Sequence, residues 1–424
     1  MKLCRALLVW GLLCMWLPAM AAEAPATDPP ASDTAAPAEN APALRLPTLE
    51  WTLGTSHHLG LAGWIVTDLM SFPRHESGFD TSWHSTFNLR AARISLRYGY
   101  GKSLSLRLDV EASTSAVEMQ EAWFQYAPFE ELKLRIGRQR VPFGLAQNVS
   151  LPDRKLMEAP LIAGNAKDFK DIGLIIRGEA WEGRVCYAAG AVTGSRDIAV
   201  NVNEVPDVAA RLIIAPFVGL HPAVSQLRLG GSVTWGLGPQ RNGFRGRTMA
   251  GFTFADPPSI RGQQLRWGAE LSWVNRYMSL AAEYQDIRQK RDELTDFQTT
   301  GQVGNLQEYH VRGWYVQASG HIWGERSDSG PVTGIELAAR GEYFNYGDGN
   351  KTLGGADYAP LPDSHVWAVT AGINGYLPYN IRVSVLWQGI WFDDMTTAPT
   401  WDPGAKADVS MPVHHIFARA QIRL

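Results

Sequence analysis

The stretch KSLSLRLDVEAS, residues 102–113, alternates apolar and polar side chains at nearly every step. One parity holds Leu104, Leu106, Leu108 and Val110, and the other holds Ser105, Arg107, Asp109 and Glu111. Because successive side chains of a β-strand point to opposite faces, the stretch predicts a strand with one apolar face and one charged face. The medium that covers the apolar face decides the fold, because it is either a protein core or a lipid bilayer.

The same alternation recurs along the chain, in residues 93–100, 131–137, 207–214, 334–344, 380–387 and 415–424. Glycine- and proline-containing turn signals separate these stretches, and no helical periodicity is sustained. The pattern therefore predicts an all-β fold of antiparallel strands, each about ten residues long.

The N-terminus predicts export. Lys2 and Arg5 precede an apolar run over residues 6–17, and small residues follow at 19–21, so residues 1–21 are expected to be a secretory signal peptide. Cys14 leaves a lipoprotein signal as the alternative. Residues 22–47 are rich in Ala and Pro and are expected to form a disordered leader. Residues 48–424 show no further low-complexity break and are treated as one domain.

Composition excludes several classes of protein. The chain has 424 residues, of which 45% are hydrophobic, and this is too apolar for a disordered protein. Its formal net charge of −3 does not favour binding to nucleic acid. Signal cleavage would leave Cys186 as the only cysteine, so no internal disulfide is expected.

Two architectures fit an all-β domain of this size. A water-soluble sandwich or small barrel would turn its leucine rows inward, whereas a membrane barrel turns them toward lipid and its arginines toward a wet lumen. The predicted mature chain has no run of eighteen apolar residues, so it can span a membrane only as a closed barrel. Three features favour the membrane barrel. The domain is undivided, and the sequence ends inside a predicted strand, which can close a barrel. Aromatic residues also lie near strand ends, namely Tyr98, Tyr100, Phe124, Tyr126, Trp273 and Trp387.

Several segments together resemble the phosphate-selective porin O/P family. The most distinctive is G-x-x-x-x-PFGL at residues 137–145, which follows the similar stretch FNLRAARISLRYGYGKSLSLRLDVEAS at 87–113. Later stretches at 313–326, 334–346 and 370–388 agree with the family in the same order. The resemblance covers about residues 87–424.

The resemblance implies a transmembrane antiparallel β-barrel of sixteen strands in the outer membrane of a Gram-negative-type envelope, with a loop folded inward to narrow the pore. It also implies a homotrimer in contact with membrane lipid, and lumenal basic residues that guide phosphate or pyrophosphate. The sequence departs from the family in its 30 arginines against 9 lysines, and its last residue is Leu424 where such barrels usually end in an aromatic residue. Alternatives are a general or weakly selective porin for another small solute, and a barrel that anchors an enzyme or adhesin.

Basic residues of the lumenal parity are the first candidates for an anion pathway. A guanidinium is planar, always charged and offers five donors that match phosphate or carboxylate oxygens. The candidates on strands are Arg97, Arg107, Lys133, Arg135, Arg177, Arg211 and Arg340, and Arg382, Arg419 and Arg423 share their parity. The alternative is that each arginine pairs with an acidic neighbour on the same wall, as Arg107 would with Asp109.

Residues 147–171 form the second candidate. They are too long for a hairpin turn, and by resemblance they are the constriction loop. They carry the basic residues Arg154, Lys155, Lys167 and Lys170 beside several acidic ones. Because residues 48–424 hold 36 basic and 38 acidic side chains, selectivity must come from where charges are placed. The alternative is a solvated extracellular loop of mixed charge.

No catalytic or metal-binding motif was found in the sequence, so no enzyme activity, cofactor or metal is expected. The expected partners are a small anionic solute and membrane lipid, with no nucleic acid.

Overall fold

The computed structural model describes residues 49–75, 81–114, 116–129, 131–164, 170–194, 205–249, 253–255, 257–295, 302–324, 333–347, 364–393 and 413–423. The predicted signal peptide and leader lie outside these residues, so the boundaries at 21 and 47 stay predictions.

Most described residues lie in antiparallel strands. The strands are β1 Leu49–Leu53, β2 His57–His75, β3 Thr81–Tyr100, β4 Leu104–Ala112, β5 Val117–Phe129, β6 Leu132–Arg140, β7 Lys170–Ala180, β8 Val185–Val192, β9 Asp207–Ile214, β10 Arg228–Asn242, β11 Gly246–Arg247, β12 Thr253–Ala255, β13 Ser259–Val274, β14 Met278–Thr295, β15 Gln302–Gly324, β16 Gly334–Gly347, β17 Ser364–Leu377, β18 Ile381–Phe392 and β19 Val413–Arg423. The short helices are η1 Ala146–Asn148, η2 Leu151–Asp153 and α2 Leu161–Gly164. Within the described ranges, no helix combines the length and hydropathy needed to cross a lipid bilayer.

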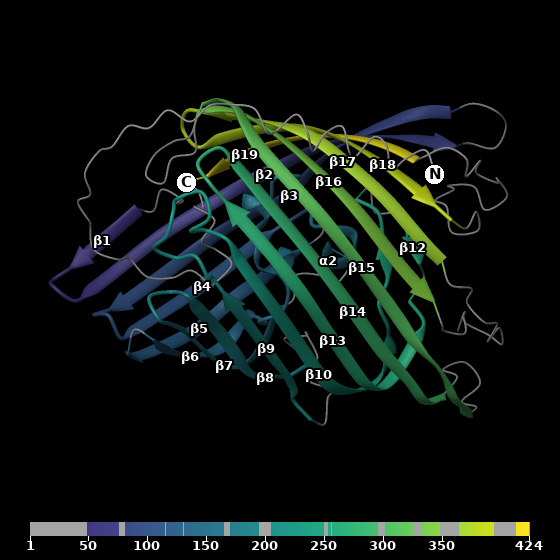
Figure 1. Cartoon of the computed structure of the whole chain (residues 1–424), viewed down its shortest axis with the longest axis horizontal. Coiled ribbons are helices and arrows are strands. Elements are labelled where there is room, and N and C mark those ends of the chain that lie inside the picture. The colour runs from purple at the N-terminus through teal and green to yellow at the C-terminus, as the bar shows by residue number, and fades with distance from the viewer. Residues whose placement is uncertain are drawn as a thin grey trace. The chain divides into compact units, whose positions relative to one another are not determined.

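The strands close into a ring. Each of β2–β10 and β13–β19 pairs with its neighbours in chain order, and β19 pairs with β2, so sixteen strands of the described chain form a closed barrel. Figure 1 shows these strands side by side. The predicted all-β barrel of sixteen strands is confirmed, although the strands are longer and more variable than predicted, up to the 23 residues of β15.

The first strand completes the edge on which the barrel closes. Strand β19 pairs with residues 64–71 of β2, and β1 pairs with residues 57–61 of the same strand. Because β3 occupies the other edge of β2 throughout, β1 continues the line of β19. The N-terminal and C-terminal strands therefore share one position in the wall.

The two faces of the wall are inverted relative to a soluble protein. On β4, Asp109 is completely buried, whereas Leu106 and Val110 are 42% and 40% exposed. The same contrast separates Arg419, which is 1% exposed, from Ile416 at 43%. A large continuous apolar exterior is stable only against lipid, so the alternation in residues 102–113 is that of a membrane barrel and not of a soluble sandwich.

Aromatic side chains lie on the outer face at two levels. Tyr100 and Tyr126 are exposed near the short-turn ends of β3 and β5. Toward the other end, Trp367 contacts Tyr343 and Trp314, with ring centroids 4.7 and 5.7 Å apart. Such bands are typical of the two interfaces between a bilayer and water.

The two ends of the barrel differ in the length of their connections. At one end strands are joined by short turns such as residues 101–103, 181–184, 275–277 and 378–380, and at the other by long segments such as 141–169, 243–258 and 393–412. The candidate loop therefore belongs to the long-connection end.

Candidate functional site

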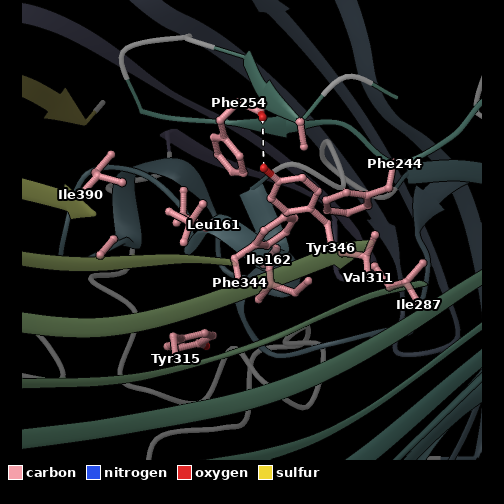
Figure 2. Close-up of a cluster of buried hydrophobic side chains, with 14 of the residues drawn as sticks. Leu161, Ile162, Phe244, Phe254, Ile287, Val311, Tyr315, Phe344, Tyr346 and Ile390 are labelled. Carbon is pink, nitrogen blue, oxygen red and sulfur yellow. Dashed lines mark hydrogen bonds between the residues drawn. The ribbon is translucent and has the colours of Figure 1, made fainter. Parts of the chain in front are cut away.

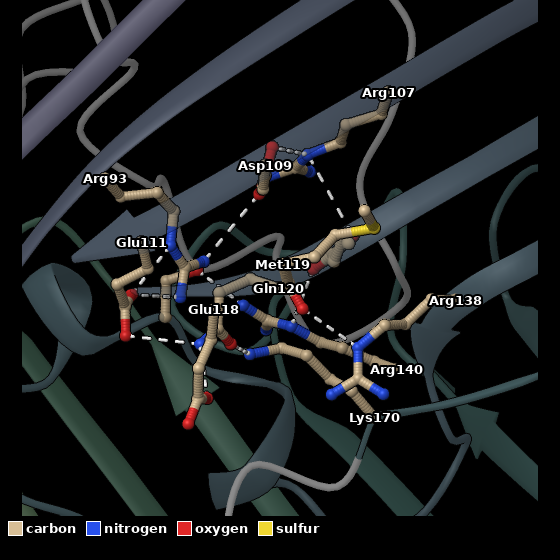
Figure 3. Close-up of polar contacts among 12 residues, drawn as sticks. Arg93, Arg107, Asp109, Glu111, Glu118, Met119, Gln120, Arg138, Arg140 and Lys170 are labelled. Atoms are coloured by element: carbon tan, nitrogen blue, oxygen red, sulfur yellow. Dashed lines mark hydrogen bonds and ion pairs between the residues drawn. The ribbon is translucent and has the colours of Figure 1, made fainter. Parts of the chain in front are cut away.

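A network of ion pairs covers the lumenal face of β3 to β7 (Figure 3). It includes Arg93 with Glu111 at 2.6 Å, Arg107 with Asp109 at 2.9 Å, and Arg140 with Glu121 at 3.3 Å. Buried carboxylates and guanidiniums offset each other's cost of leaving water only when they are paired in this way. The network therefore fixes the charged side chains of this wall.

Several of the predicted pathway arginines pair with carboxylates, among them three of the strand candidates. Arg107 bonds Asp109 through two nitrogens, Arg211 bonds both oxygens of Glu270 at 2.6 and 3.1 Å, and the Nε atom of Arg340 lies 2.7 Å from Glu342. For these three, the alternative interpretation of the sequence, pairing along the same wall, describes the structure.

The other four basic residues predicted on strands also lie on the lumenal parity. Arg135 bonds the side-chain oxygen of Gln125 and lies 3.7 Å from the ring centroid of Trp123. Arg177 donates to Gln139 at 3.4 Å. Arg97 lies opposite Arg107 in register, and Lys133 lies opposite Arg177, so the sheet places like charges next to each other at both positions.

The PFGL motif turns the chain away from β6. Phe143 is fully buried beside Val141 and Ile175. Gly144 has a φ of +69°, and a side chain there would collide with the carboxylate of Glu283 on β14. Glycine is required because it tolerates both the left-handed backbone and this close approach. The backbone N–H of Gly144 then donates to Ser232 on β10, at 3.1 Å.

The segment that follows contacts strands from much of the ring. The N–H of Ala146 donates to Glu283 at 2.9 Å, and the amine of Lys155 lies 2.8 Å from the carboxylate of Glu336. Arg419 donates to the carbonyl of Met157 at 2.6 Å, and Arg423 lies 2.6 Å from the carboxylate of Asp153. These strand residues belong to β14, β16 and β19 and have the lumenal parity. We call residues 141–164 the inner segment.

The predicted basic residues of this region have different positions. Lys155 is half-buried against Glu336 and Tyr376, and Arg154 lies 3.6 Å from Glu158. Lys170 is the first residue of β7 rather than a loop residue, and its buried amine donates to Gln120. Lys167 lies outside the described residues.

Glu158 joins the inner segment to two strands. Arg90 donates to both of its carboxylate oxygens at 2.8 and 3.1 Å, and Arg419 donates to it at 2.8 Å. Burial alone would raise the pKa of the Glu158 carboxyl, but Arg90, Arg419 and Arg154 together hold this pKa well below its usual range. The carboxylate is therefore charged at neutral pH.

Apolar side chains gather on part of the lumenal side of β14 to β18. Leu161 and Ile162 of α2 pack there with Phe244 and Phe254, against Phe344 (Figure 2). The centroids of the Phe254 and Phe344 rings are 5.5 Å apart. This cluster occupies part of the lumenal space beside β14 to β18.

A cavity of about 800 Å³ lies beside the inner segment. Its lining comes from β2, β3 and β19 on one side of the ring and from β10, β13 and β14 on the other, together with the inner segment. Six arginines line it, namely Arg90, Arg241, Arg245, Arg247, Arg266 and Arg419. Asp68 and Glu158 are the only carboxylates among the described lining residues, so the cavity has an excess of positive charge.

Of these six arginines, only Arg419 was predicted from the sequence pattern. Arg90 is the extra residue of a β-bulge, where Ala91 pairs with Val66 and Leu89 with Thr67, so strict alternation could not assign its face. Arg245 and Arg247 lie in the connection between β10 and β13, where periodicity carries no information. The sequence signal that could have indicated these residues is the positive charge of residues 241–247, where three of seven positions are arginine.

Comparisons with known proteins agree with this fold. The family described as phosphate-selective porin O and P matches residues 74–407. A search of curated proteins found no match.

Among solved structures, the in-vitro folded outer membrane protein OmpT of Vibrio cholerae is 12% identical with a TM-score of 0.56, and covers 88% of this chain and 99% of its own. An anion-selective porin from Comamonas acidovorans is 12% identical with a TM-score of 0.55, covering 87% and 99%. The outer membrane channel DcaP of Acinetobacter baumannii is 11% identical with a TM-score of 0.51, covering 88% and 99%. At these identities the similarity concerns the fold alone.

Proposed function

Because the chain belongs to the phosphate-selective porin O and P family and is therefore an outer-membrane porin, we propose that it passes small anions by passive diffusion. Family and fold are those of a channel rather than an enzyme. The anion-selective porin from Comamonas acidovorans, which has a similar fold, supports this proposal. Phosphate, named in the family description, is the first anion to compare with chloride.

The observation that carries the proposal is the charge of the cavity. Six arginines and two carboxylates line it, while the domain as a whole has nearly balanced charge. Low-dielectric walls strengthen the field of such a cluster and raise the local concentration of anions. A passive channel needs this attraction to be moderate, so that the ion also leaves.

The inner segment is proposed as the constriction. Its contacts with β14, β16 and β19 and the apolar cluster around α2 would leave a narrowed passage through the cavity. Arg154 and Lys155, the basic residues predicted there, would then lie where the solute passes. Lys167 is proposed for the same region on sequence grounds, and Lys170, the first residue of β7, is proposed for the adjoining wall.

A weakly selective porin is the second candidate. Arg107, Arg211 and Arg340 are each paired with a carboxylate, which reduces the net field along the wall. In that case the barrel would pass small solutes of either sign with a modest preference.

The assembly and orientation are proposed from the similar fold of other outer-membrane barrels. OmpT of Vibrio cholerae has a trimer form, and a homotrimer embedded in lipid is proposed for this chain. In outer-membrane barrels the short turns face the periplasm, so the long connections and the cavity entrance would face the exterior.

Conductance in a planar bilayer with a salt gradient tests the proposal. Discrete conductance steps with a reversal potential that indicates anion preference are expected, and replacing chloride by phosphate should retain current. A silent bilayer with correctly folded protein would contradict any channel, and a cation-directed reversal potential would contradict the anion pathway.

The basic residues of the constriction have their own test. Replacing Lys155, Lys167 and Lys170 by Gln removes three positive charges and should shift the reversal potential toward cations. The control is Lys102→Gln, which removes a charge in the exposed turn between β3 and β4. Equal reversal potentials for the triple variant and the control would remove these lysines from the pathway.

A further inference from the structure

The cavity has two walls of different chemistry. One, the arginine wall, consists of Arg241, Arg245, Arg247 and Arg266 from β10, β13 and the connection between them. The other, the thioether wall, consists of Met70, Met157, Met249 and Phe417.

The thioether wall is a packed apolar surface. Met157 and Phe417 are 2% and 3% exposed and form a buried cluster with Leu386, and the half-buried Met70 and Met249, which pack against this cluster, present the apolar surface of the wall. Met249 comes from the same connection as Arg245 and Arg247, so the two walls meet there. Methionine side chains adapt to ligands of different shape and make favourable contacts with aromatic rings.

The carboxylates of the cavity lie apart from the arginine wall. Asp68 accepts two bonds from Arg419 at 2.6 and 2.7 Å, and Glu158 is held by Arg90 and Arg419. These pairs belong to β2, β3, β19 and the inner segment. Among the described lining residues, no carboxylate comes from the β10–β13 side, although Asp207 and Asp171 act on Arg241 from outside the lining.

We propose that this cavity binds organic carboxylates that carry an apolar body, in preference to phosphate and other strongly hydrated inorganic anions. The inference rests on the proposed anion channel and names the class of solute for its cavity. A carboxylate is matched by a single guanidinium through two parallel hydrogen bonds, which leaves the apolar body to contact the thioether wall.

Phosphate fits these two walls less well. It must replace hydration around all of its oxygens, and an apolar wall offers no donor, so part of its desolvation would be uncompensated. An aromatic or alkyl group instead gains free energy by leaving water. The volume of about 800 Å³ also lies in the range of sites for small organic molecules.

Block of single-channel current in a planar bilayer tests the inference. The probes are benzoate, acetate, inorganic phosphate and the neutral benzyl alcohol, each added to the full-length folded protein in chloride. Benzoate should halve the current at about a tenfold lower concentration than acetate, because its ring buries apolar surface in the cavity. Phosphate should block more weakly than benzoate, and benzyl alcohol should not block.

Variants separate the two walls. Met249→Gln should raise the half-blocking concentration of benzoate several-fold and leave that of acetate unchanged, whereas Met249→Leu should retain benzoate block. Arg266→Gln should weaken block by both carboxylates. Arg261→Gln, on the same strand but outside the cavity, is the matched control and should change neither value.

The outcomes distinguish this inference from the channel itself. Equal block by benzoate and acetate, or stronger block by phosphate, would overturn the solute class while leaving an anion channel. Benzoate block that is unaffected by Met249→Gln and Arg266→Gln would overturn the assignment to this cavity. A folded protein without conductance steps would overturn the proposed channel.

Discussion

At the scale of single residues, Glu158 has the most far-reaching contacts of the inner segment. Its carboxylate bonds Arg90 on β3 and Arg419 on β19, two strands on either side of β2. Arg419 also bonds Asp68 of β2 and the carbonyl of Met157. One carboxylate therefore joins the inner segment to the place where the barrel closes.

Replacing Glu158 by Gln should loosen the inner segment. The change removes charge-assisted bonds worth about 1.5–3 kcal/mol and leaves Arg90 and Arg419 with fewer acceptors. Increased open-channel current noise in single-channel recordings is expected. Glu131→Gln, in the short turn between β5 and β6, is the control and should show the same open-channel current noise as the unmodified protein.

The lowered pKa of Glu158 gives the direction of its pH dependence. The carboxyl of an unfolded chain titrates near about 4.3, and in the folded protein the pKa lies well below this value. The contribution of Glu158 to stability is therefore complete above the unfolded value and is lost as pH falls through the lowered one. Open-channel noise should stay constant from about pH 7 to about pH 4. A rise in noise near pH 5 would contradict the assignment of Glu158 as the anchor.

At the scale of elements, the inner segment is held by apolar packing as well as by charge. Ile162 of α2 is 1% exposed and lies against Gly313 of β15, where a side chain would meet its Cβ atom at 3.1 Å. Phe344 and Val311 belong to the same cluster. The small residue on β15 thus makes room for the helix on the lumenal face.

Ile162→Ala should weaken this packing without disturbing the ring of strands. Removing a buried isoleucine side chain costs about 2–5 kcal/mol, and the backbone hydrogen bonds of the barrel do not depend on it. We expect normal folding by gel mobility without heating, together with a larger and noisier single-channel conductance. Ile176→Ala, at an exposed position of the outer face on β7, should leave the conductance unchanged.

At the scale of the whole molecule, the inverted faces of the wall determine where the protein is stable. Leu106 faces outward, whereas Ser105 is bonded by the lumenal Gln125 at 3.3 Å. Neighbouring positions on one strand therefore meet lipid and the lumen respectively.

A lysine should distinguish these two environments. Leu106→Lys places a charge in the lipid and should reduce folding into vesicles by about 2 kcal/mol, with a smaller cost the closer the site lies to the interface. Ser105→Lys should fold nearly as well as the unmodified protein. Folding yields in vesicles of defined lipid composition measure the difference, and equal losses for both variants would contradict the membrane-facing assignment of Leu106.

Local sequence patterns predicted the fold because strand alternation is a local property. The alternation in residues 102–113 correctly predicted both faces of β4, and the parity of Arg211 and Arg340 correctly predicted that they lie on the lumenal wall. Their ion-pair partners were less predictable. Asp109 is two residues from Arg107, but Glu270 is 59 residues from Arg211 and reaches it only because β10 lies between β9 and β13.

The sequence by itself determined the antiparallel strand pattern, the membrane barrel and the lumenal parity of strand residues such as Arg107 and Arg211, because these depend on neighbours along the chain and on the contrast between lipid and water. Only the tertiary structure decided which charges meet in the cavity. Arg90 was directed there by a bulge and Arg247 by a long connection, and both depend on contacts between segments that are brought together when the barrel closes. No periodicity records such contacts, since their geometry is fixed by the closed ring rather than by the local chain.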